Sequence, residues 1–421
     1  MDRLVIRGGR PLRGTVEIGG AKNAALPALA ATLLSDKPVT LENVPAVADV
    51  ATMETVLGHY NVSVTRNAGH ALTIDAAAAR SADAPYDIVR KMRAAFLVLG
   101  PLLGRFGQAR VSLPGGCAIG ARPVDLHVKG LVALGADISV EGGYITGRVP
   151  GRLRGTRIAL PFASVGATEA ILLAATAAEG ETEIVNAARE PEVVDLAQFL
   201  ATMGVRIEGA GTHRILVEGP TTFQPARHAV IADRIEVGTY AVAAAITGGE
   251  LELVGARLEH LAAVGAALES AGARLWPGDR GLMVSRSEPL KSVDVVTQSY
   301  PGFATDLQAQ FMALMSIAGG NSVIRETVFE NRFMHVPELA RLGADILLRG
   351  TTAVVRGVRR LHGAPVMATD LRASVCLVLA GLVAEGETAV SRIYHLDRGY
   401  EHLDRKLVRC GADIVRVTED K

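Results

Sequence analysis

A pattern of apolar and polar positions repeats six times along the chain. Each copy begins with an apolar, alanine-rich stretch, continues through a turn with glycine or acidic residues, and ends in a run rich in β-branched residues. The apolar stretch predicts a helix, and the β-branched run after the turn predicts a strand. The six turns are marked by Asp36, Gly107, Gly180, Gly249, Gly320 and Gly386, which follow one another at intervals of 66 to 73 residues.

A second marker repeats with the same period. Late in each copy a leucine stands four residues before a glycine, and a short run such as Ala136 to Val140 follows. The glycines are Gly135, Gly204, Gly272, Gly343 and Gly411, with a degenerate version at Gly58, and their spacings are 68 to 77 residues. Glycine readily adopts the left-handed conformation that ends a helix, and the alternation in the runs predicts half-buried strands. Two unrelated markers therefore define one repeat of about 70 residues.

The repeat predicts the architecture. Each copy holds about two helices and three or four strands, which is typical of a small α+β subdomain rather than a solenoid repeat. Six subdomains make an α/β protein with two domains of three repeats, 22–229 and 1–21 together with 230–421. The polar stretch 223–227 is expected to link the domains, and the strand Leu4 to Ile6 is expected to complete the last repeat. We expect substrate to bind between the two halves.

Composition narrows the class of protein. Of the 421 residues, 49% are hydrophobic and 21% are charged, which indicates a folded globular chain. The 44 basic and 44 acidic side chains cancel and aromatic residues make up 4%, so we expect no nucleic-acid partner. The first residues lack the zones of a signal peptide, and apolar runs such as 375–384 are too short to cross a membrane. We therefore expect a cytoplasmic protein without membrane contact.

The sequence contains no recognisable metal or nucleotide motif. Its three cysteines, Cys117, Cys376 and Cys410, are far apart and fit neither a disulfide framework nor a paired-cysteine metal site. Cys376 and Cys410 lie in apolar helical patterns and are expected to be buried. There is no Gly-x-x-x-x-Gly-Lys-Ser/Thr loop, no Gly-x-Gly-x-x-Gly after a strand and no His-Glu-x-x-His. We therefore expect no metal and no cofactor.

Polar side chains gather at the predicted starts of the first helices. They are Lys22 and Asn23, Lys91 and Arg93, Ser164 with Thr168 and Glu169, Asp233, Arg234 and Glu236, Thr305 and Asp306, and Thr369 and Asp370 with Arg372. Serine, threonine and aspartate cap the amides of a helix start, so these members are either caps or functional groups. Cations oppose the helix dipole at this end, so Lys22 and Arg93 favour an anionic ligand over the alternative of a solvated surface charge.

The glycine-rich segment 113–127 contains the largest group of candidate catalytic residues. Three glycines surround Cys117, which predicts an accessible thiol on a tight turn. Arg122 would favour the thiolate, so Cys117 is a candidate nucleophile or proton donor, and His127 is a candidate base. Near the end of the chain, Arg398 beside a glycine is a candidate second anion ligand or a surface ion pair.

Five segments and the sixfold repeat resemble the UDP-N-acetylglucosamine 1-carboxyvinyltransferase family. The segments are 20–24, 114–127, 303–308, 330–335 and 397–401. The family fold is a two-domain, inside-out α/β barrel, and the cysteine loop distinguishes the family from the EPSP synthases that share this fold. The resemblance implies transfer of the enolpyruvyl group of phosphoenolpyruvate to the 3-hydroxyl of UDP-N-acetylglucosamine. That reaction is the first committed step of peptidoglycan synthesis and uses no cofactor.

The resemblance also implies residue roles in an addition followed by an elimination. Cys117 is the implied general acid at C3 of phosphoenolpyruvate and can hold this substrate covalently, while Asp306 is the implied base. Lys22, Arg122 and Arg398 are the implied ligands of its phosphate and carboxylate, since cationic and bidentate donors suit both groups. The residues implied to contact the UDP-sugar or shape its site are Asn23, Arg93, Arg122, Pro123, Val124, Asp125, Leu126, Ser164, Val165, Gly166, Asp306 and Val328, with Arg372 as a further anion ligand.

One position departs from the family pattern. Phe162 and Ala163 stand where some members have a lysine before the Ser-Val-Gly turn, so we expect activity with altered nucleotide contacts. Two alternatives stay open. One is an enolpyruvyl transferase that acts on another nucleotide sugar or on a shikimate phosphate, and the other is a catalytically silent paralogue that binds the UDP-sugar. The oligomeric state is also left open.

Overall fold

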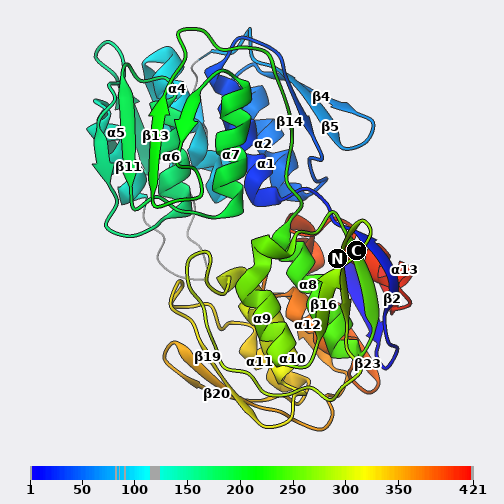
Figure 1. Ribbon diagram of the computed structural model, residues 1–421. Helices are drawn as coiled ribbons and strands as arrows, with labels where there is room; N and C mark the ends of the chain where they lie inside the picture. Colours follow the sequence, from blue (N-terminus) through cyan, green and yellow to red (C-terminus); the bar gives the residue numbers. More distant parts are fainter. Residues whose placement is uncertain (1, 81–82, 85, 90–91, 114–123, 419–421) are drawn as a thin grey trace. The chain divides into compact units, whose positions relative to one another are not determined.

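The computed structural model describes residues 2–80, 83–84, 86–89, 92–113 and 124–418. The chain divides into two compact units. The first unit contains the described residues between 20 and 231, and the second contains those between 2 and 19 and between 232 and 418. Each unit has its own hydrophobic core. Figure 1 shows the elements of both units along the chain.

The first unit is built from short alternating helices and strands. In chain order they are α1 (Lys22–Ala31), η1 (Thr32–Leu34), β3 (Val39–Glu42), α2 (Ala48–His59), β4 (Ser63–Asn67), β5 (Ala71–Asp75), β6 (Asp83–Ala84), α3 (Tyr86–Val89), η2 (Arg93–Val98), α4 (Leu99–Phe106), β7 (Gln108–Ser112), α5 (Asp125–Ala133), β8 (Asp137–Glu141), β9 (Tyr144–Arg148), β10 (Arg157–Ala159), α6 (Val165–Ala175), β11 (Glu181–Val185), α7 (Pro191–Thr202), β12 (Arg206–Glu208), β13 (Arg214–Glu218) and β14 (Ala226–Ala229).

The second unit has the same alternation. Its elements are β1 (Asp2–Arg7), β2 (Arg13–Glu17), α8 (Arg234–Thr247), β15 (Glu250–Val254), η3 (Leu258–Leu261), α9 (Ala262–Ser270), β16 (Arg274–Pro277), β17 (Gly281–Ser285), β18 (Val295–Val296), η4 (Thr305–Leu307), α10 (Gln308–Met315), β19 (Asn321–Arg325), α11 (Val336–Arg341), β20 (Asp345–Arg349), β21 (Thr352–Arg356), β22 (Pro365–Met367), α12 (Val375–Gly381), β23 (Glu387–Ser391), η5 (Ile393–Arg398), α13 (Leu403–Arg409) and β24 (Asp413–Thr418).

The described strands form six four-stranded sheets of one topology. In each sheet an edge strand runs parallel to its neighbour and the other two strands are antiparallel, as in the order β10-β11-β13-β12. The other sheets have the orders β14-β3-β5-β4, β6-β7-β9-β8, β16-β17-β15-β2, β18-β19-β21-β20 and β22-β23-β1-β24. Each repeat of the sequence therefore corresponds to one sheet, and the sixfold repeat predicted from the two markers is confirmed.

Strands from distant parts of the chain complete three of these sheets. β1 pairs antiparallel with β23 and β24, placing Leu4 opposite Val390 and Arg416. The first strand thus completes the last repeat, as expected. β2 joins β15 in parallel, and β14 joins β3 in parallel. The chain therefore enters the second unit first, leaves it to build the whole first unit, and returns.

One helix of each repeat is buried in the middle of its unit. These central helices are α1, α4 and α6 in the first unit and α8, α10 and α12 in the second. In the second unit the three pack against one another, and in the first α4 packs against α6. The sheets have one buried and one exposed face, as in β11, where buried Thr182 and Ile184 alternate with more exposed residues. Each unit therefore has its three central helices inside and its sheets outside.

The second helix of each repeat ends as the glycine marker predicted, with one exception. Gly135, Gly204, Gly272, Gly343 and Gly411 all have φ between 91° and 102°. The degenerate marker at Gly58 was wrong, because α2 continues to His59 and the left-handed residue is Asn61, with φ of 63°. The Asn61 side-chain amide donates to the carbonyl of Ala78 at 2.9 Å. Asparagine tolerates this conformation because its short polar side chain bonds locally.

Two further expectations need correction. The stretch 223–227 is not a plain link, because Ala226–Ala229 forms β14 and pairs with β3. The run Ala136 to Val140 does contain strand β8, but this strand is not half-buried, since only Ile138 is partly covered and the rest is exposed. β8 is the outermost strand of its sheet, so it has a neighbour on one side alone.

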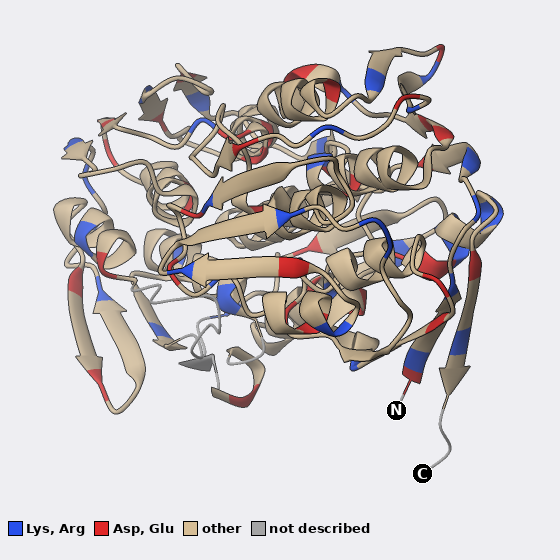
Figure 2. Ribbon diagram, turned by 90° about the horizontal axis from the view of Figure 1, so that it is seen from below, with Lys and Arg blue, Asp and Glu red and all other residues tan. Residues whose placement is uncertain are grey.

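Charged residues of both signs are interspersed along the helices and strands of the described chain (Figure 2). Many form exposed pairs, such as Arg280 with Glu252 at 2.6 Å and Arg416 with Asp397 at 2.5 Å. This mixing agrees with the balanced composition. None of the described helices combines the length and the apolar character that a membrane crossing requires.

Candidate active site

In the second unit, the starts of the three central helices bring opposite charges together. Asp233 precedes α8, Asp306 lies in η4 just before α10, and Arg372 lies just before α12. Arg372 donates from Nη2 to Asp233 Oδ2 at 3.1 Å, and its Nε lies 3.7 Å from Asp306 Oδ2. The side chains of Asp233 and Arg372 are 5% and 3% exposed, whereas Asp306 is 25% exposed. Each of the three repeats thus contributes one charged group to a single buried cluster.

The pKa of Arg372 follows from this environment. Burial alone lowers the pKa of the guanidinium, but Asp233, Tyr400 and Asp306 outweigh burial and raise it above the ordinary arginine value. The guanidinium also lies over the ring of Tyr400, with 5.2 Å from its carbon to the ring centroid. Arg372 is therefore a permanent cation fixed between two carboxylates and an aromatic face.

A second arginine holds Asp306 from the other side. Arg332 donates from Nη2 to Asp306 Oδ1 at 2.5 Å and from Nη1 to the hydroxyl of Thr305 at 2.9 Å. The Arg332 side chain is 5% exposed. Because guanidinium and carboxylate are both planar, two bonds to adjacent residues fix the orientation of the Asp306 carboxylate. Neither Thr305 nor Asp306 caps its helix, so the capping interpretation of these two residues is wrong.

Buried polar side chains form hydrogen bonds with one another and with the backbone of this cluster. Gln310 donates from Nε2 to the backbone carbonyl of Asp306 at 2.9 Å and to the hydroxyl of Tyr400 at 3.2 Å. The Tyr400 hydroxyl lies 2.9 Å from the Thr239 hydroxyl. Burial raises the pKa of Tyr400 to about 12, so its hydroxyl keeps its proton at neutral pH. The backbone that carries Asp306 is therefore tied to α8 and α10.

The start of α12 is built differently. The side chain of Asp370 accepts bonds from the amides of Arg372 and Ala373, each at 2.8 Å. Asp370 thus caps the turn that precedes α12, while the N-cap position of α12 itself is Ser374, and this turn sets the direction of Arg372. His335, the residue before α11, lies nearby and is fully buried. Burial lowers the pKa of His335 to about 4, with Asp370 opposing and Arg332 reinforcing the shift, so this ring is neutral at pH 7.

In the first unit, Lys22 is the first residue of α1 and is buried. Its Nζ lies 3.2 Å from Oδ2 of Asp49, in the first turn of α2, and both side chains are less than a tenth exposed. A lysine at a helix start opposes the helix dipole, and the carboxylate offsets this cost. The cation predicted at this helix start is therefore present and pre-oriented by Asp49.

The other candidate residues of the first unit also stand at helix starts. Asn23 follows Lys22 in α1, and half-buried Arg93 opens η2, which packs against α1, α4 and α6. Ser164 caps α6 by accepting the amide of Ala167 at 3.4 Å, and Val165 and Gly166 form the first turn. η2 therefore contacts all three central helices of the first unit.

The segment after the cysteine loop adjoins the start of α6. Val124 precedes α5, exposed Asp125 opens it, and Leu126 is buried. His127 lies so close to Gly166 that a Cβ there would stand 2.8 Å from its Nε2. A side chain at 166 would therefore require the His127 ring to shift, and α5 packs against α6, so the structure brings together 124–126 and 164–166 as two neighbouring helix starts.

The remaining predicted residues differ in their exposure and in the elements that carry them. Val328 follows β19 and is 37% exposed, while Phe162, the departure from the family pattern, is 63% exposed. Arg398 is the last residue of η5 and is half-buried. The segment that carries it lies between two non-glycine residues of positive φ, Arg392 at 57° and His402 at 50°. Cys117, Arg122 and Pro123 lie outside the described residues.

Sequence reasoning missed several members of these clusters. Asp49 was not singled out, and Arg332 was quoted within 330–335 without a role. Glu326, whose carboxylate accepts from Thr305, was also missed. The signal available for Arg332 was an arginine between Asn331 and Phe333 in a segment that resembles the family. For Asp49 and Glu326 the sequence gave no signal beyond an acidic residue without an evident role, because their partners lie tens of residues away in sequence.

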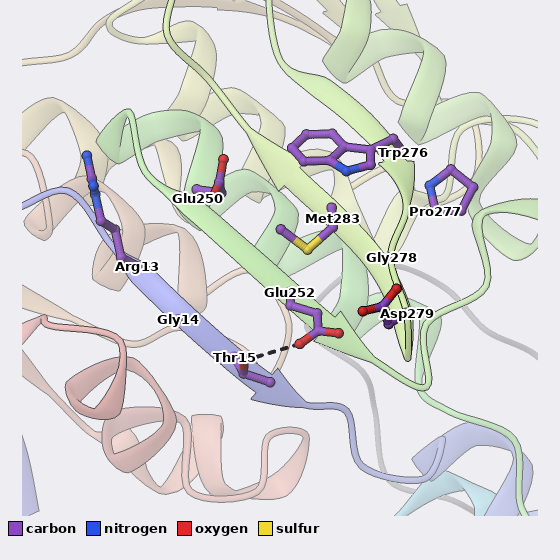
Figure 3. Close-up of a pocket in the computed structure, with 10 residues that line it drawn as sticks. All are labelled: Arg13, Gly14, Thr15, Glu250, Glu252, Trp276, Pro277, Gly278, Asp279 and Met283. Atoms are coloured by element: carbon purple, nitrogen blue, oxygen red, sulfur yellow. Dashed lines mark hydrogen bonds between the residues drawn. The ribbon is translucent and has the colours of Figure 1, made fainter.

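A separate hollow of about 480 Å³ lies on the outer face of one sheet of the second unit. Thr15, Glu252, Met283 and Trp276 form a row across β2, β15, β17 and β16, and the Thr15 hydroxyl donates to Glu252 at 3.3 Å (Figure 3). None of the predicted site residues lines this hollow. It is a feature of the sheet surface rather than of the helix starts. The described residues also hold no group of three or more potential metal ligands.

Comparison with known proteins shows the family of this chain. Residues 6–407 match the family EPSP synthase (3-phosphoshikimate 1-carboxyvinyltransferase). UDP-N-acetylglucosamine 1-carboxyvinyltransferase 2 of Mesorhizobium japonicum is 66% identical over 418 residues, covering 99% of this chain and 100% of the relative. UDP-N-acetylglucosamine 1-carboxyvinyltransferase of Rhodospirillum centenum is 59% identical over 431 residues and covers both chains completely.

Solved structures resemble the whole chain as well. The enolpyruvyl transferase NikO from Streptomyces tendae has a TM-score of 0.90 at 28% identity and covers 100% of this chain and 99% of its own. EPSP synthase from Acinetobacter baumannii has a TM-score of 0.77 at 18% identity, with 99% and 100% covered, which shows the shared fold. The chain belongs to the EPSP synthase family and, within it, to the UDP-N-acetylglucosamine 1-carboxyvinyltransferases. The predicted fold, a two-domain inside-out α/β barrel of six repeats, is confirmed.

Proposed function

We propose that this protein is a transferase that moves the enolpyruvyl group of phosphoenolpyruvate to the 3-hydroxyl of UDP-N-acetylglucosamine and releases phosphate. The observation that carries the proposal is the identity of 58% to 66%, over nearly the whole chain, with curated proteins named for this reaction. The reaction stands at the first committed step of peptidoglycan synthesis. It requires no cofactor, because proton transfers and a phosphate leaving group suffice.

The proposed chemistry is an addition followed by an elimination. In the addition, the sugar oxygen bonds to C2 of phosphoenolpyruvate, Cys117 gives a proton to C3, and Asp306 accepts the hydroxyl proton. In the elimination, the bond from C2 to the phosphate oxygen breaks and C3 gives up a proton, which restores the double bond. The fixed carboxylate of Asp306, held by Arg332 and near Arg372, supports its role as the acceptor.

Phosphoenolpyruvate carries a phosphate and a carboxylate, and the proposed ligands are cations. Lys22, Arg122 and Arg398 are assigned to these groups, with Arg372 as a further cation of the site. Buried Lys22 with its partner Asp49 supports this assignment, since an oriented ammonium suits a phosphate. The proposed UDP-sugar contacts are Asn23, Arg93, Arg122, Pro123, Val124, Asp125, Leu126, Ser164, Val165, Gly166, Asp306 and Val328. The packing of α1, α6 and η2 supports the part of this set that lies in the first unit.

A cytoplasmic protein without nucleic-acid partners fits this proposal. The thiols of Cys376 and Cys410 are unpaired and buried, as expected in a reducing compartment. The balanced charges offer no basic surface for a polyanion.

Phosphate release is the measurement that tests the proposal. Purified protein and phosphoenolpyruvate are combined with UDP-N-acetylglucosamine, with shikimate 3-phosphate, or with neither. Release that depends on the UDP-sugar is the expected result. Release with shikimate 3-phosphate alone would instead assign the other acceptor, and binding of the UDP-sugar without release would indicate a silent paralogue. In that last case Phe162, which stands where some members of the family have a lysine, is the first position to change.

A further inference from the structure

Strand β20 of the fifth repeat stands at the end of its sheet, next to β21 alone. On its other side, the backbone N–H and C=O groups have no strand partner among the described residues. Such an edge is a template for pairing with another strand, and proteins usually protect it with charges, a proline or a bulge. On β20, two leucines are exposed instead, Leu347 by 39% and Leu348 by 38%.

An apolar row crosses the outer face of this sheet and ends at the open edge. Leu347 lies opposite Val354 of β21, and Val354 lies opposite Val323 of β19. Val323 is 39% exposed, and Val354 is partly exposed. Because side chains two positions apart in a strand share a face, Asp345 and Arg349 flank Leu347 on this outer face. The edge therefore presents one apolar side chain between two charges of opposite sign.

The charges on this edge are complementary to themselves. When a second copy of β20 lies antiparallel to the first with Leu347 opposite Leu347, Asp345 of each copy faces Arg349 of the other. Arg349 has no ion-pair partner among the described residues. Asp345 pairs with Arg356 at 3.3 Å, but both side chains are half exposed, and a carboxylate can accept from two arginines. Opposite charges and apolar pairs across two strands both stabilise their pairing.

Strand β8 of the second repeat shows the opposite arrangement. It has the same place at the end of its sheet, the same length as β20 and the same pattern of exposure. Its end residues, Asp137 and Glu141, are both acidic, so an antiparallel pair of two β8 strands would place like charges opposite each other. Its central residue is Ser139, where β20 has Leu347. The edge of β8 therefore resists self-pairing, and the edge of β20 favours it.

We propose that two copies of this protein associate through β20, edge to edge and antiparallel, about a twofold axis at Leu347. The two four-stranded sheets then form one continuous sheet with an unbroken apolar row on its outer face. Both copies use the same surface, so the assembly closes at a dimer. One strand from each copy buries less surface than a permanent dimer needs, so we expect a dissociation constant of about 10 to 100 µM. The proposal is independent of the enzyme activity.

Sedimentation velocity of the full-length protein tests the proposal. Samples between about 1 and 200 µM are compared at low salt, because salt screens exposed ion pairs. We expect the sedimentation coefficient to rise from the monomer value towards the dimer value over this range. Leu347→Lys places two ammonium groups at the twofold axis and is expected to weaken association at least about tenfold. A protein that stays monomeric throughout would overturn the proposal and leave the edge to a strand of another protein.

Two charge variants test the antiparallel register. Arg349→Asp gives the strand two acidic ends, and Asp345→Arg gives it two basic ends, so each variant repels its own copy. We expect each variant alone to stay monomeric up to about 200 µM, and an equimolar mixture of the two to associate, because acidic ends then face basic ends. If either variant alone associates as strongly as the original protein, or if the mixture stays monomeric, the proposal fails.

Val140→Lys is the matched control. It adds the same charge at an exposed apolar residue of the edge strand β8, where Val140 is 54% exposed. We expect this variant to associate like the original protein, and equal weakening by Val140→Lys and Leu347→Lys would also overturn the proposal. Urea unfolding of every variant shows that the fold is kept, and we expect similar midpoints because the altered side chains are exposed.

Discussion

The third and fifth repeats use the same position for opposite purposes. In the third, Asn186 follows β11 with φ of 57°, and its side-chain amide donates to the carbonyl of Leu160 at 2.7 Å. This contact ties one strand to its neighbour and involves no charged group. In the fifth, Glu326 follows β19, accepts from Thr305, and so reaches the residue next to Asp306. One repeat uses the position to close a turn, and the other uses it to orient a candidate proton acceptor.

The comparison teaches where to look for chemistry in a repeat protein. In repeats that keep the left-handed residue, the residue at this position serves only the fold. The second repeat also departs, because Leu113, after β7, does not have a positive φ. The segment that follows Leu113 carries Cys117. The two departures thus lead to the proposed acid and to the support of the proposed base.

The largest loss of activity is expected for a substitution of Cys117, in the segment that follows Leu113 in the second repeat. Cys117→Ala removes the proposed proton donor, and general acids contribute up to about 10⁴-fold to rate. We expect phosphate release near pH 7 to fall by about a thousandfold or more while the unfolding transition is unchanged. Cys117→Asp, which can still donate a proton, is expected to retain function. If the alanine variant released phosphate at the normal rate, Cys117 would not be the general acid.

The next effect tests the fifth repeat directly. Glu326→Gln keeps the shape but replaces one acceptor oxygen with a donor, so Thr305 loses its partner. A hydrogen bond to a charged group contributes about 1.5 to 3 kcal/mol, which corresponds to roughly a tenfold to hundredfold loss of kcat if the orientation of Asp306 depends on it. Steady-state kinetics measure this. If the variant keeps its kcat and only loses stability, Glu326 has a purely structural role, like Asn186.

A third effect concerns the pH dependence of stability in the fifth repeat. His335 has a pKa of about 4 when folded and an ordinary value of 6.5, so the unfolded chain binds the extra proton between these values. Stability is therefore greatest above pH 6.5 and falls as the pH is lowered towards 4. The expected loss from this residue is about 2 kcal/mol between pH 7 and pH 5. Urea unfolding at the two pH values measures it.

The control for this effect is a residue that cannot be protonated. His335→Gln is expected to be less stable at pH 7, because a buried site is disturbed, but to show a smaller fall between pH 7 and pH 5. If the fall is the same in both proteins, His335 is not its source.

The smallest effect lies in the third repeat. Asn186→Ala removes the bond to Leu160 and places an alanine in a left-handed conformation, at a cost of about 1 kcal/mol in the free energy of unfolding. We expect no change in kcat. Asn186→Gly, which restores the backbone freedom but not the bond, should recover part of the stability. A fall in kcat for Asn186→Ala would erase the contrast between the two repeats.

Much of the fold could be predicted because its signals are local. A glycine that ends a helix declares itself within a few residues, and five of the six second-helix ends were found in this way. The exception, Asn61, used another residue type for the same backbone conformation. The exposure of β8 was not predictable, because it depends on β8 standing at the edge of its sheet.

The candidate site was only partly accessible from the sequence. Lys22 stood out because a cation at a helix start conflicts with the helix dipole, and the structure supplies Asp49 as its partner. Asp306 was singled out at a predicted helix start, but its role came from the family resemblance. Nothing in the sequence joined Asp306 to Arg332 or to Glu326, although all three lie within the fifth repeat.

By itself, the sequence determined the number of repeats, the helix ends, the burial of Cys376 and Cys410, and the family. These depend on local periodicity and on residues that one backbone conformation requires. Only the tertiary structure decided which charges meet. Arg332 and Asp306 are 26 positions apart, and Arg372 and Asp233 are 139 apart. Such pairs are selected by how the central helices pack, because burial forces each charge to find a partner that no local pattern names.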